Sequence, residues 1–383
     1  MKMARSLLLI LALLILPGAP SSAGAAEKAD TVRIGVYLPL TGAMAARGQA
    51  EYAGITVAHK MKPAVLGTDV ELFPIDTATE GVGTAGAATR LIREHKVHAL
   101  IGEPLGNDPL EGLSVSEGAR KPTVIPSVHP PVIRGKRYAF SIALTDTLEG
   151  ETAARYAFSR LKTEKAAVLM NIERDYSIAL ANIFTRTFTE AGGKIVAVAY
   201  SRTGDTDFTT QLSSIMTAKA DVLYLPVPHP EIARICRQSV EMGINAHMIA
   251  SSDAHTPELI TAGGKHVKGV ILTSDFGTGG ESADVAAAYA DTFEKETGGR
   301  AGRLDALGAD AYFLLLDAIE RGRSTAGSKM RQALARTKGF RGISGVMNMG
   351  GGRNAVKGVA ILQIQGDTFR HLETLPPGKK EER

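Results

Sequence analysis

The chain has 383 residues, in which 44 lysines and arginines stand against 40 aspartates and glutamates, and its formal net charge is +4. Its one strongly basic stretch, Lys379–Lys380, is followed at once by two glutamates, so neither nucleic acid nor a membrane surface is an expected partner. The single cysteine, Cys236, excludes an intramolecular disulfide. Because it shares a helical face with Ile232 and Val240, it is expected to be buried and unreactive.

The N-terminus is typical of a secretory signal. Lys2 and Arg5 precede an apolar run over Leu7–Leu16, and small residues follow at Ala23–Ala26. We therefore expect residues 1–26 to be cleaved and the mature chain to reach the periplasm. No cysteine lies near the cleavage site, so no lipid anchor is expected, and no later apolar run approaches the ~20 residues of a membrane span.

The remaining sequence alternates between strand and helix patterns. Helical spacing of three and four is present over residues 180–188, 208–216 and 232–240. This alternation predicts parallel sheets covered on both faces, and a chain of this length predicts two of them. The expected fold class is α/β, with two doubly wound parallel-sheet lobes. The expected strands are Val32–Leu38, Val70–Ile75, Ala99–Ile101, Thr123–Ile125, Ala166–Met170, Ile195–Ala199, Val222–Leu225, Met248–Ala250 and Val270–Thr273.

Two passages between the lobes are expected, at Ser141–Glu149 and Ser274–Glu281. Repeated crossing of this kind would form a hinge. The segment Phe340–Phe369 has the pattern of a glycine-rich hairpin, with three glycines at 350–352 between two apolar runs. Residues 373–383 are expected to be a disordered tail.

Several helix starts follow strands directly, with proline near the first helical position at Pro109, Pro230 and Pro257. The carboxyl ends of parallel strands are where ligands bind in open α/β sheets. We therefore expect a ligand cleft between the lobes, formed by the loops at these ends. The loops are Leu40–Gly48, Glu103–Asp108 and Ser127–Pro131 in the first half, and Asn171–Tyr176, Pro226–Pro230 and Ser251–Thr256 in the second.

Motifs that could indicate catalysis are incomplete. Gly81–Gly86 matches a dinucleotide fingerprint, but Asp76–Glu80 separates it from the preceding strand, so a bound nucleotide cofactor is not expected. His95 and His98 lack a third metal ligand nearby. Ser251–His255 contains the residue types of a triad, but adjacent residues cannot converge as a triad requires. No enzyme, cofactor or metal site is predicted. The alternative is a secreted enzyme that binds a nucleotide through Gly81–Gly86, and the absence of nucleotide binding would exclude it.

The ordered motifs resemble those of a known family. In its order of motifs the chain resembles the leucine/isoleucine/valine-binding proteins. The motifs are Leu38–Gly42 followed by Gly48 and Gly54, then Ala99–Gly102, Asp207-Phe208, His229–Glu231 and Asp310-Ala311. These are periplasmic solute receptors of ABC importers with the type I two-lobed fold, and the resemblance covers essentially the whole mature chain.

The resemblance implies a division into lobes. Residues 31–143 with 274–340 would form lobe 1, and residues 144–273 with 341–372 would form lobe 2, joined by three crossing segments. It also implies a monomer that closes on one small ligand by a hinge motion and is then recognised by the membrane permease.

The resemblance also implies a binding site. Two lobe 1 loops would hold an α-carboxylate, and a tyrosine and an acidic residue of lobe 2 would hold an α-ammonium group. The acidic position falls at Ser252 or Asp253, of which only Asp253 is a carboxylate. Two positions depart from the family: His129 stands where a small residue is usual, and Arg47 stands where an aromatic residue is frequent. Aligned by motif, the site residues are Arg47, Gly106, Asn107, Ser127, Val128, His129, Tyr176 and Asp253.

The identity of the ligand stays open between two classes. Tyr176 with Asp253 favours an α-amino acid. His129 with Arg47 adds donors on the lobe 1 side and favours a carboxylate without the amine, such as an aromatic or keto acid. A sensory protein that presents its closed form to a receptor, rather than a transport receptor, would have the same cleft.

Overall fold

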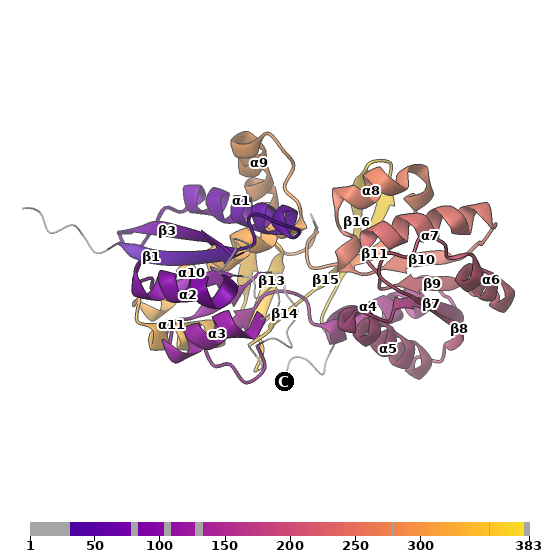
Figure 1. Ribbon diagram of the computed structural model, residues 1–383, viewed down its shortest axis with the longest axis horizontal. Coiled ribbons are helices and arrows are strands. Elements are labelled where there is room, and N and C mark those ends of the chain that lie inside the picture. Colours follow the sequence, from indigo (N-terminus) through magenta and orange to yellow (C-terminus); the bar gives the residue numbers. More distant parts are fainter. Residues whose placement is uncertain are drawn as a thin grey trace, which may run out of the picture. The chain divides into compact units, whose positions relative to one another are not determined.

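The computed structural model describes residues 31–77, 83–102, 109–126, 133–277, 279–351 and 353–378. Within these ranges the strands form a six-stranded, a seven-stranded and a three-stranded sheet (Figure 1). The two large sheets are mainly parallel and helices cover them, which confirms the predicted α/β fold class.

The six-stranded sheet contains β1 (Val32–Leu38), and parallel pairing extends from it on both sides. Its order is β2-β3-β1-β4-β5-β6, and only the β2–β3 pair is antiparallel among the described strands. The other strands are β2 (Ala64–Val65), β3 (Thr68–Asp76), β4 (Ala99–Gly102), β5 (Thr123–Ile125) and β6 (Ala139–Ser141).

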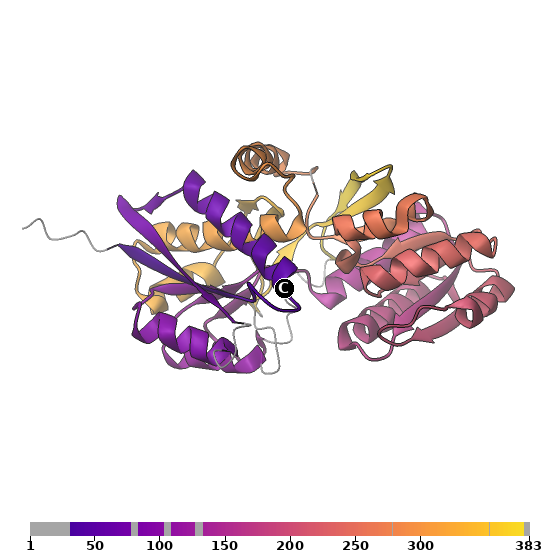
Figure 2. The same ribbon diagram turned by 45° about the horizontal axis from the view of Figure 1, so that its top comes forward.

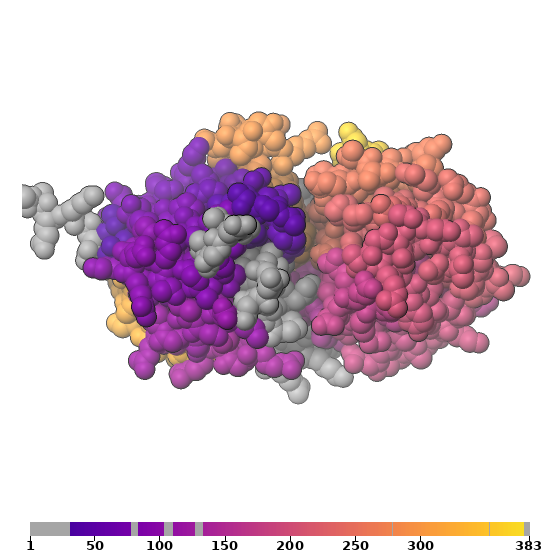
Figure 3. Space-filling model, viewed as in Figure 1, coloured from indigo at the N-terminus to yellow at the C-terminus, as the bar shows by residue number. Residues whose placement is uncertain are grey.

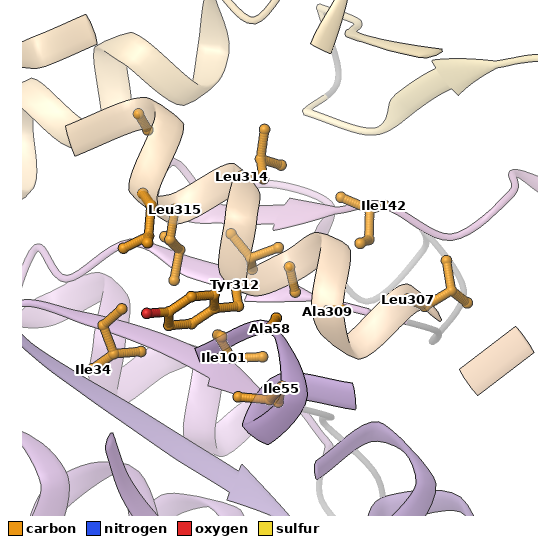
Figure 4. Close-up of a cluster of buried hydrophobic side chains, with 14 of the residues drawn as sticks. Ile34, Ile55, Ala58, Ile101, Ile142, Leu307, Ala309, Tyr312, Leu314 and Leu315 are labelled. Carbon is orange, nitrogen blue, oxygen red and sulfur yellow. The ribbon is translucent and has the colours of Figure 1, made fainter. Parts of the chain in front are cut away.

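Alternation along β1 sends its side chains to opposite faces. Ile34 packs with α1 (Ala45–Met61) and α10 (Arg303–Gly322), as Figure 4 shows, whereas Tyr37 belongs to the cluster with α2 (Gly83–Arg93). α3 (Pro109–Gly118) places Leu113 in a small cluster with residues of β5 and β6. The core of this lobe therefore lies on both sides of one sheet.

Helices α1 and α10 approach closely enough to require glycine. A Cβ at Gly54 would collide with the Asp305 carbonyl oxygen, and one at Gly308 would collide with that of Glu51. α9 (Ala283–Thr297) lies beside α1 (Figure 3) and contributes Tyr289 and Phe293 to the same core. α11 (Gly327–Ala335) packs on α10. Late segments of the chain thus complete the lobe that the early segments begin.

The seven-stranded sheet has the order β16-β15-β11-β10-β9-β7-β8. Among its described strands, the pairs of β15 are antiparallel and the others are parallel. The strands are β7 (Lys165–Asn171), β8 (Lys194–Ser201), β9 (Val222–Leu225), β10 (His247–Ala250), β11 (Ile271–Ser274), β15 (Val359–Gln365) and β16 (Thr368–Leu375).

Helices cover both faces of this sheet, as the turned view in Figure 2 helps to show. In β9, Val222 and Tyr224 join the cluster with α4 (Asp146–Arg155) and α5 (Asp175–Glu190). Leu223 and Leu225 join the opposite cluster, which includes residues of α6 (Thr209–Ala218), α7 (His229–Glu241) and α8 (Pro257–Gly263). A π-helical turn, Tyr156–Arg160, ends α4. Cys236 of α7 is fully buried, and burial raises the pKa of its thiol to about 12.

Among the described residues, three segments join the two large sheets. They run from β6 to α4, from β11 to α9 and through Gly358, which separates β14 (Ala355–Lys357) from β15. The predicted passage at Ser141–Glu149 extends too far, because α4 begins at Asp146 under a Thr145 cap whose hydroxyl accepts from the Leu148 N–H at 3.1 Å. Glu149 therefore lies on a helix and not in a linker.

The glycine-rich hairpin divides between lobes. β12 (Phe340–Gly342), β13 (Gly345–Met349) and β14 form the three-stranded antiparallel sheet, whose Met347, Met349 and Ala355 are buried in the core of the first lobe. Residues 341–357, assigned from the resemblance to lobe 2, thus pack with lobe 1. The apolar run that begins at Val356 belongs to two sheets because Gly358 interrupts it.

The predicted disordered tail starts too early. Residues 373–375 end β16, where Glu373 pairs with Ile361 in register and binds Arg160 through Nε at 3.0 Å. Half-buried and exposed residues alternate from Phe369 to Leu375 along this edge strand, and its many polar residues gave its end the composition of a tail. Residues 379–383 and the predicted signal, residues 1–26, lie outside the described residues.

Candidate functional site

The candidate site of the second lobe lies at the carboxyl ends of its parallel strands. β7, β10 and β11 end at Asn171, Ala250 and Ser274, and their parallel pairing brings these ends to one edge. Buried polar side chains gather there although most of the sheet is apolar: Asn171, Ser201, Glu231, Ser251, Ser252 and Thr273 are all buried. Such groups persist in a core when they are hydrogen-bonded.

Tyr176 is placed by the first turn of α5. Its partly buried hydroxyl donates to Glu149 Oε2 at 2.8 Å and lies 3.4 Å from Ser252 Oγ. Burial, then the negative charges of Glu149 and Asp253, raise the pKa of Tyr176 well above its ordinary value. The phenol therefore keeps its proton at any physiological pH and acts as a hydrogen-bond donor to the carboxylate.

Glu149 was not predicted as a site residue, yet it is the centre of this cluster. It is fully buried on α4, and Oε1 accepts the Ser252 backbone N–H at 2.5 Å and the Thr273 hydroxyl at 2.8 Å. The Ser252 hydroxyl also lies 3.3 Å from Oε2. The sequence signal that could have revealed it is a glutamate four residues after the Thr145 cap, on a helix face that is otherwise buried.

Asp253 lies in a short 3₁₀ turn, Ser252–Ala254, directly after β10. Its half-buried carboxylate lies 3.9 Å from Arg174 Nη2. Its negative charge helps to raise the pKa of Tyr176. It also acts on His229, the first residue of α7: burial lowers the pKa of this histidine, and the charges of Glu258 and Asp253 partly offset that fall. Two predicted residues, Tyr176 and Asp253, are thus brought to the same edge.

Arg47, in the first turn of α1, is half-buried, and its Nε lies 3.6 Å from Glu51 Oε1 one helical turn away. This ion pair holds the guanidinium along its own helix. The remaining predicted residues, Gly106, Asn107, Ser127, Val128 and His129, lie outside the described residues, and their role stays a prediction.

A second polar cluster lies where the chain passes between the sheets. The carboxylate of Asp275, directly after β11, accepts hydrogen bonds from Arg303. Nε donates to Oδ1 at 2.5 Å and Nη2 donates to Oδ2 at 3.1 Å, and both side chains are buried. Burial opposes ionisation of Asp275, but the charges of Arg303 and Lys357 outweigh it and lower its pKa to about 2. The negative charge of Asp253 also raises the pKa of Arg303.

Lys357 extends the cluster to the three-stranded sheet. Its ammonium donates to Ser344 Oγ at 2.8 Å, and Asp310 accepts from the Ile343 and Ser344 N–H groups at 2.6 and 2.8 Å. Burial lowers the pKa of Lys357 and raises that of Asp310. This network positions two crossing segments against the start of α10, and nothing in the local sequence pattern predicted it.

His255 lies beside the same crossing segment. Its Nδ1 is 2.8 Å from Ser274 Oγ, and its ring contacts Phe276 and Phe369. Burial and then Arg303 lower its pKa to about 3, so the imidazole is neutral. Over the described ranges there is no cluster of three or more metal-ligating side chains, and no helix there is long and apolar enough to cross a membrane.

Comparison with known proteins identifies relatives of the whole described fold. The family described as periplasmic binding protein matches residues 31–368. An amino acid binding protein from Pseudomonas aeruginosa is 30% identical over 252 residues, which are 64% of this chain and 67% of that protein. These matches confirm the resemblance inferred from the sequence motifs.

Two solved structures are similar. A leucine-binding protein from Thermotoga maritima is 35% identical, with a TM-score of 0.79 over 91% of this chain and 99% of that one. A solute-binding protein of an ABC transporter from Rhodopseudomonas palustris, in complex with 3,4-dihydroxybenzoic acid, is 21% identical, with a TM-score of 0.77 over 91% of this chain and 98% of that one. The second likeness concerns the fold alone.

Proposed function

Because the chain belongs to the family of periplasmic binding proteins, we propose that it captures a small α-amino acid and delivers it to the permease of an ABC importer. It acts as a non-enzymatic, monomeric receptor in the periplasm after cleavage near Ala26. The observation that carries the choice of ligand is the meeting of Tyr176 and Asp253 at one sheet edge. A carboxylate and a phenol oxygen are acceptors that suit an ammonium group.

The lobe 1 half of the proposed site rests on the sequence. Ser127 with neighbouring backbone N–H groups would hold the ligand carboxylate, and His129 would stand beside it. The relatives named for amino acids support this reading, including the leucine-binding protein at 35% identity.

An aromatic or keto acid is the second candidate. The fold relative complexed with 3,4-dihydroxybenzoic acid supports it, as do the additional donors that His129 and Arg47 would supply. Within this alternative, the ligand would lack the amine and the specificity would shift to the lobe 1 side.

The test is a thermal-shift screen of the purified mature chain against amino acids and simple carboxylic acids, followed by mass spectrometry of any ligand retained on purification. A ligand at 100 times its Kd should add ~2.7 kcal/mol to the free energy of unfolding. A rise in melting temperature with amino acids supports the proposal. A rise with carboxylic acids that lack an amine, and none with amino acids, would contradict it.

A further inference from the structure

We propose that Glu149 is a positioning residue that fixes the Tyr176 hydroxyl as a donor to itself, so that a ligand at Tyr176 must supply a hydrogen-bond donor. This inference rests on the proposed function, because it takes Tyr176 to face the ligand. It adds a residue that the motif alignment did not assign, and it names the chemical group that the ligand must carry: an ammonium or a hydroxyl.

The groups around the Glu149 carboxylate determine which of its oxygens accept hydrogen bonds. The Ser252 backbone N–H can only donate, so Glu149 Oε1, at 2.5 Å, must be an acceptor. The Thr273 hydroxyl, whose other close neighbour is the Ala250 carbonyl oxygen at 3.4 Å, donates to the same atom. Two donors thus orient the carboxylate and leave Oε2 directed at Tyr176.

The Tyr176 phenol has a single proton to donate. At 2.8 Å from Glu149 Oε2, the Tyr176 hydroxyl directs its one O–H at the carboxylate. A hydroxyl that has committed its proton keeps acceptor capacity through its lone pairs. Any further group that approaches the phenol oxygen is therefore favoured when it brings a proton of its own.

A second acceptor, the Asp253 carboxylate, lies near the Tyr176 phenol. Asp253 follows Ser252, whose Oγ lies 3.4 Å from the phenol oxygen, and its carboxylate can only accept when ionised. An acceptor pair of this kind attracts an ammonium or hydroxyl, whereas a ligand that presents only oxygen acceptors would leave both groups facing lone pairs. The donor requirement thus arises from Glu149 through Tyr176 and is strengthened by Asp253.

The experiment measures a preference ratio with matched ligands. The probes are L-leucine against 4-methylpentanoate, and 4-hydroxybenzoate against benzoate; the members of each pair differ by one donor-bearing group. Isothermal titration of the wild-type mature chain should show the donor-bearing member of a pair bound at least about ten-fold more tightly.

The decisive variant is Glu149→Gln. The glutamine has the same shape; its carbonyl oxygen can accept from Ser252 and Thr273, and its NH₂ can donate to the Tyr176 oxygen. The phenol proton is then released toward the ligand, and the preference ratio should fall at least about ten-fold. Tyr176→Phe should lower the ratio as well. Cys236→Ala, a buried substitution in the same lobe, is the matched control and should leave the ratio unchanged.

The outcomes separate the inference from the function on which it rests. If Tyr176→Phe lowers the ratio and folded Glu149→Gln keeps it, the role of Glu149 is overturned while the proposed function stands. If no amino acid raises the melting temperature in the thermal-shift screen, the proposed function fails and the inference falls with it. If amino acids bind but Tyr176→Phe changes no affinity, the inference alone is overturned. Should Glu149→Gln not fold, neutron diffraction of the wild-type chain decides: a phenol proton that points away from Glu149 overturns the inference.

Discussion

Two buried carboxylates of this protein are stabilised in different ways. Asp275 is held by a guanidinium through two contacts, with Lys357 adding a second positive charge. The described donors to Glu149 are neutral: one backbone N–H and the hydroxyls of Tyr176, Ser252 and Thr273. An ion pair has one low-energy arrangement in a core, whereas hydroxyls can rotate and exchange donor and acceptor roles.

The difference suits the places where the two groups lie. The Asp275 cluster joins a crossing segment to the start of α10 through a buried ion pair. The Glu149 cluster lies at the sheet edge where the ligand is proposed to bind, and there a change of one proton can change recognition without disturbing the core. Substitutions that remove charge while keeping shape should therefore affect stability at the first cluster and ligand preference at the second.

The largest expected effect is that of Asp275→Asn. It leaves the Arg303 guanidinium buried without its counter-charge, and removing one partner of a buried pair costs about 3–5 kcal/mol. Urea denaturation followed by circular dichroism measures the loss in the free energy of unfolding. Glu373→Gln, in the exposed pair with Arg160, is the control and should cost at most about 1 kcal/mol. Equal losses would contradict the importance of burial.

The next effect is a pH dependence from His255. Its folded-state pKa of about 3 lies below the ordinary 6.5, so below pH 6.5 the unfolded chain binds a proton that the folded chain does not. The free energy of unfolding should fall by up to about 1.4 kcal/mol for each pH unit between 6.5 and 3. His255→Phe should remove this part of the slope. An unchanged slope in that variant would show that the imidazole is protonated in the fold.

A smaller effect is expected for the stability of Glu149→Gln. Because the surrounding hydroxyls can turn to accept from the new amide, the loss in the free energy of unfolding should be about 1 kcal/mol. The measurement is the same urea titration used for Asp275→Asn. A loss as large as that of the Asp275 variant would remove the distinction between the two clusters.

An effect of similar size is expected for Thr273→Val. It removes one of the hydroxyl donors to Glu149 Oε1 while the Ser252 N–H remains, and should cost about 1 ± 0.5 kcal/mol. Differential scanning calorimetry would show a modest fall in melting temperature with an unchanged unfolding enthalpy within error. A loss of several kcal/mol would indicate that Thr273, rather than the backbone N–H, orients the carboxylate.

Much of the fold could be predicted because its signals are local. β1, β5 and β9 have the predicted bounds, since each is a short apolar run between polar or turn residues. α7 covers the helical spacing recognised over residues 232–240. The sheet edge that carries Tyr176 and Asp253 followed from the same reasoning, because parallel strands bring their carboxyl ends together.

What could not be predicted depends on partners distant in the sequence. Glu149 has the appearance of an ordinary helix residue, and its donors are 27 to 124 residues away along the chain. The end of β16 resembled a tail because the strand is an edge that is rich in polar residues, and every second residue from Arg370 on is exposed. Residues 341–357 were assigned to lobe 2 from the resemblance, whereas Met347, Met349 and Ala355 pack in the core of lobe 1; the hairpin pattern by itself does not say which core it will join.

The sequence by itself determined the α/β class, the order of strands and helices, the family and the edge where a ligand is to be sought, because periodicity and helix-start chemistry act within a few residues. Only the tertiary structure decided that Asp275 is neutralised by Arg303, that Gly358 divides two sheets and that Tyr176 donates to Glu149. Those outcomes follow from burial, which favours the arrangements in which polar groups find partners that lie far away in the sequence.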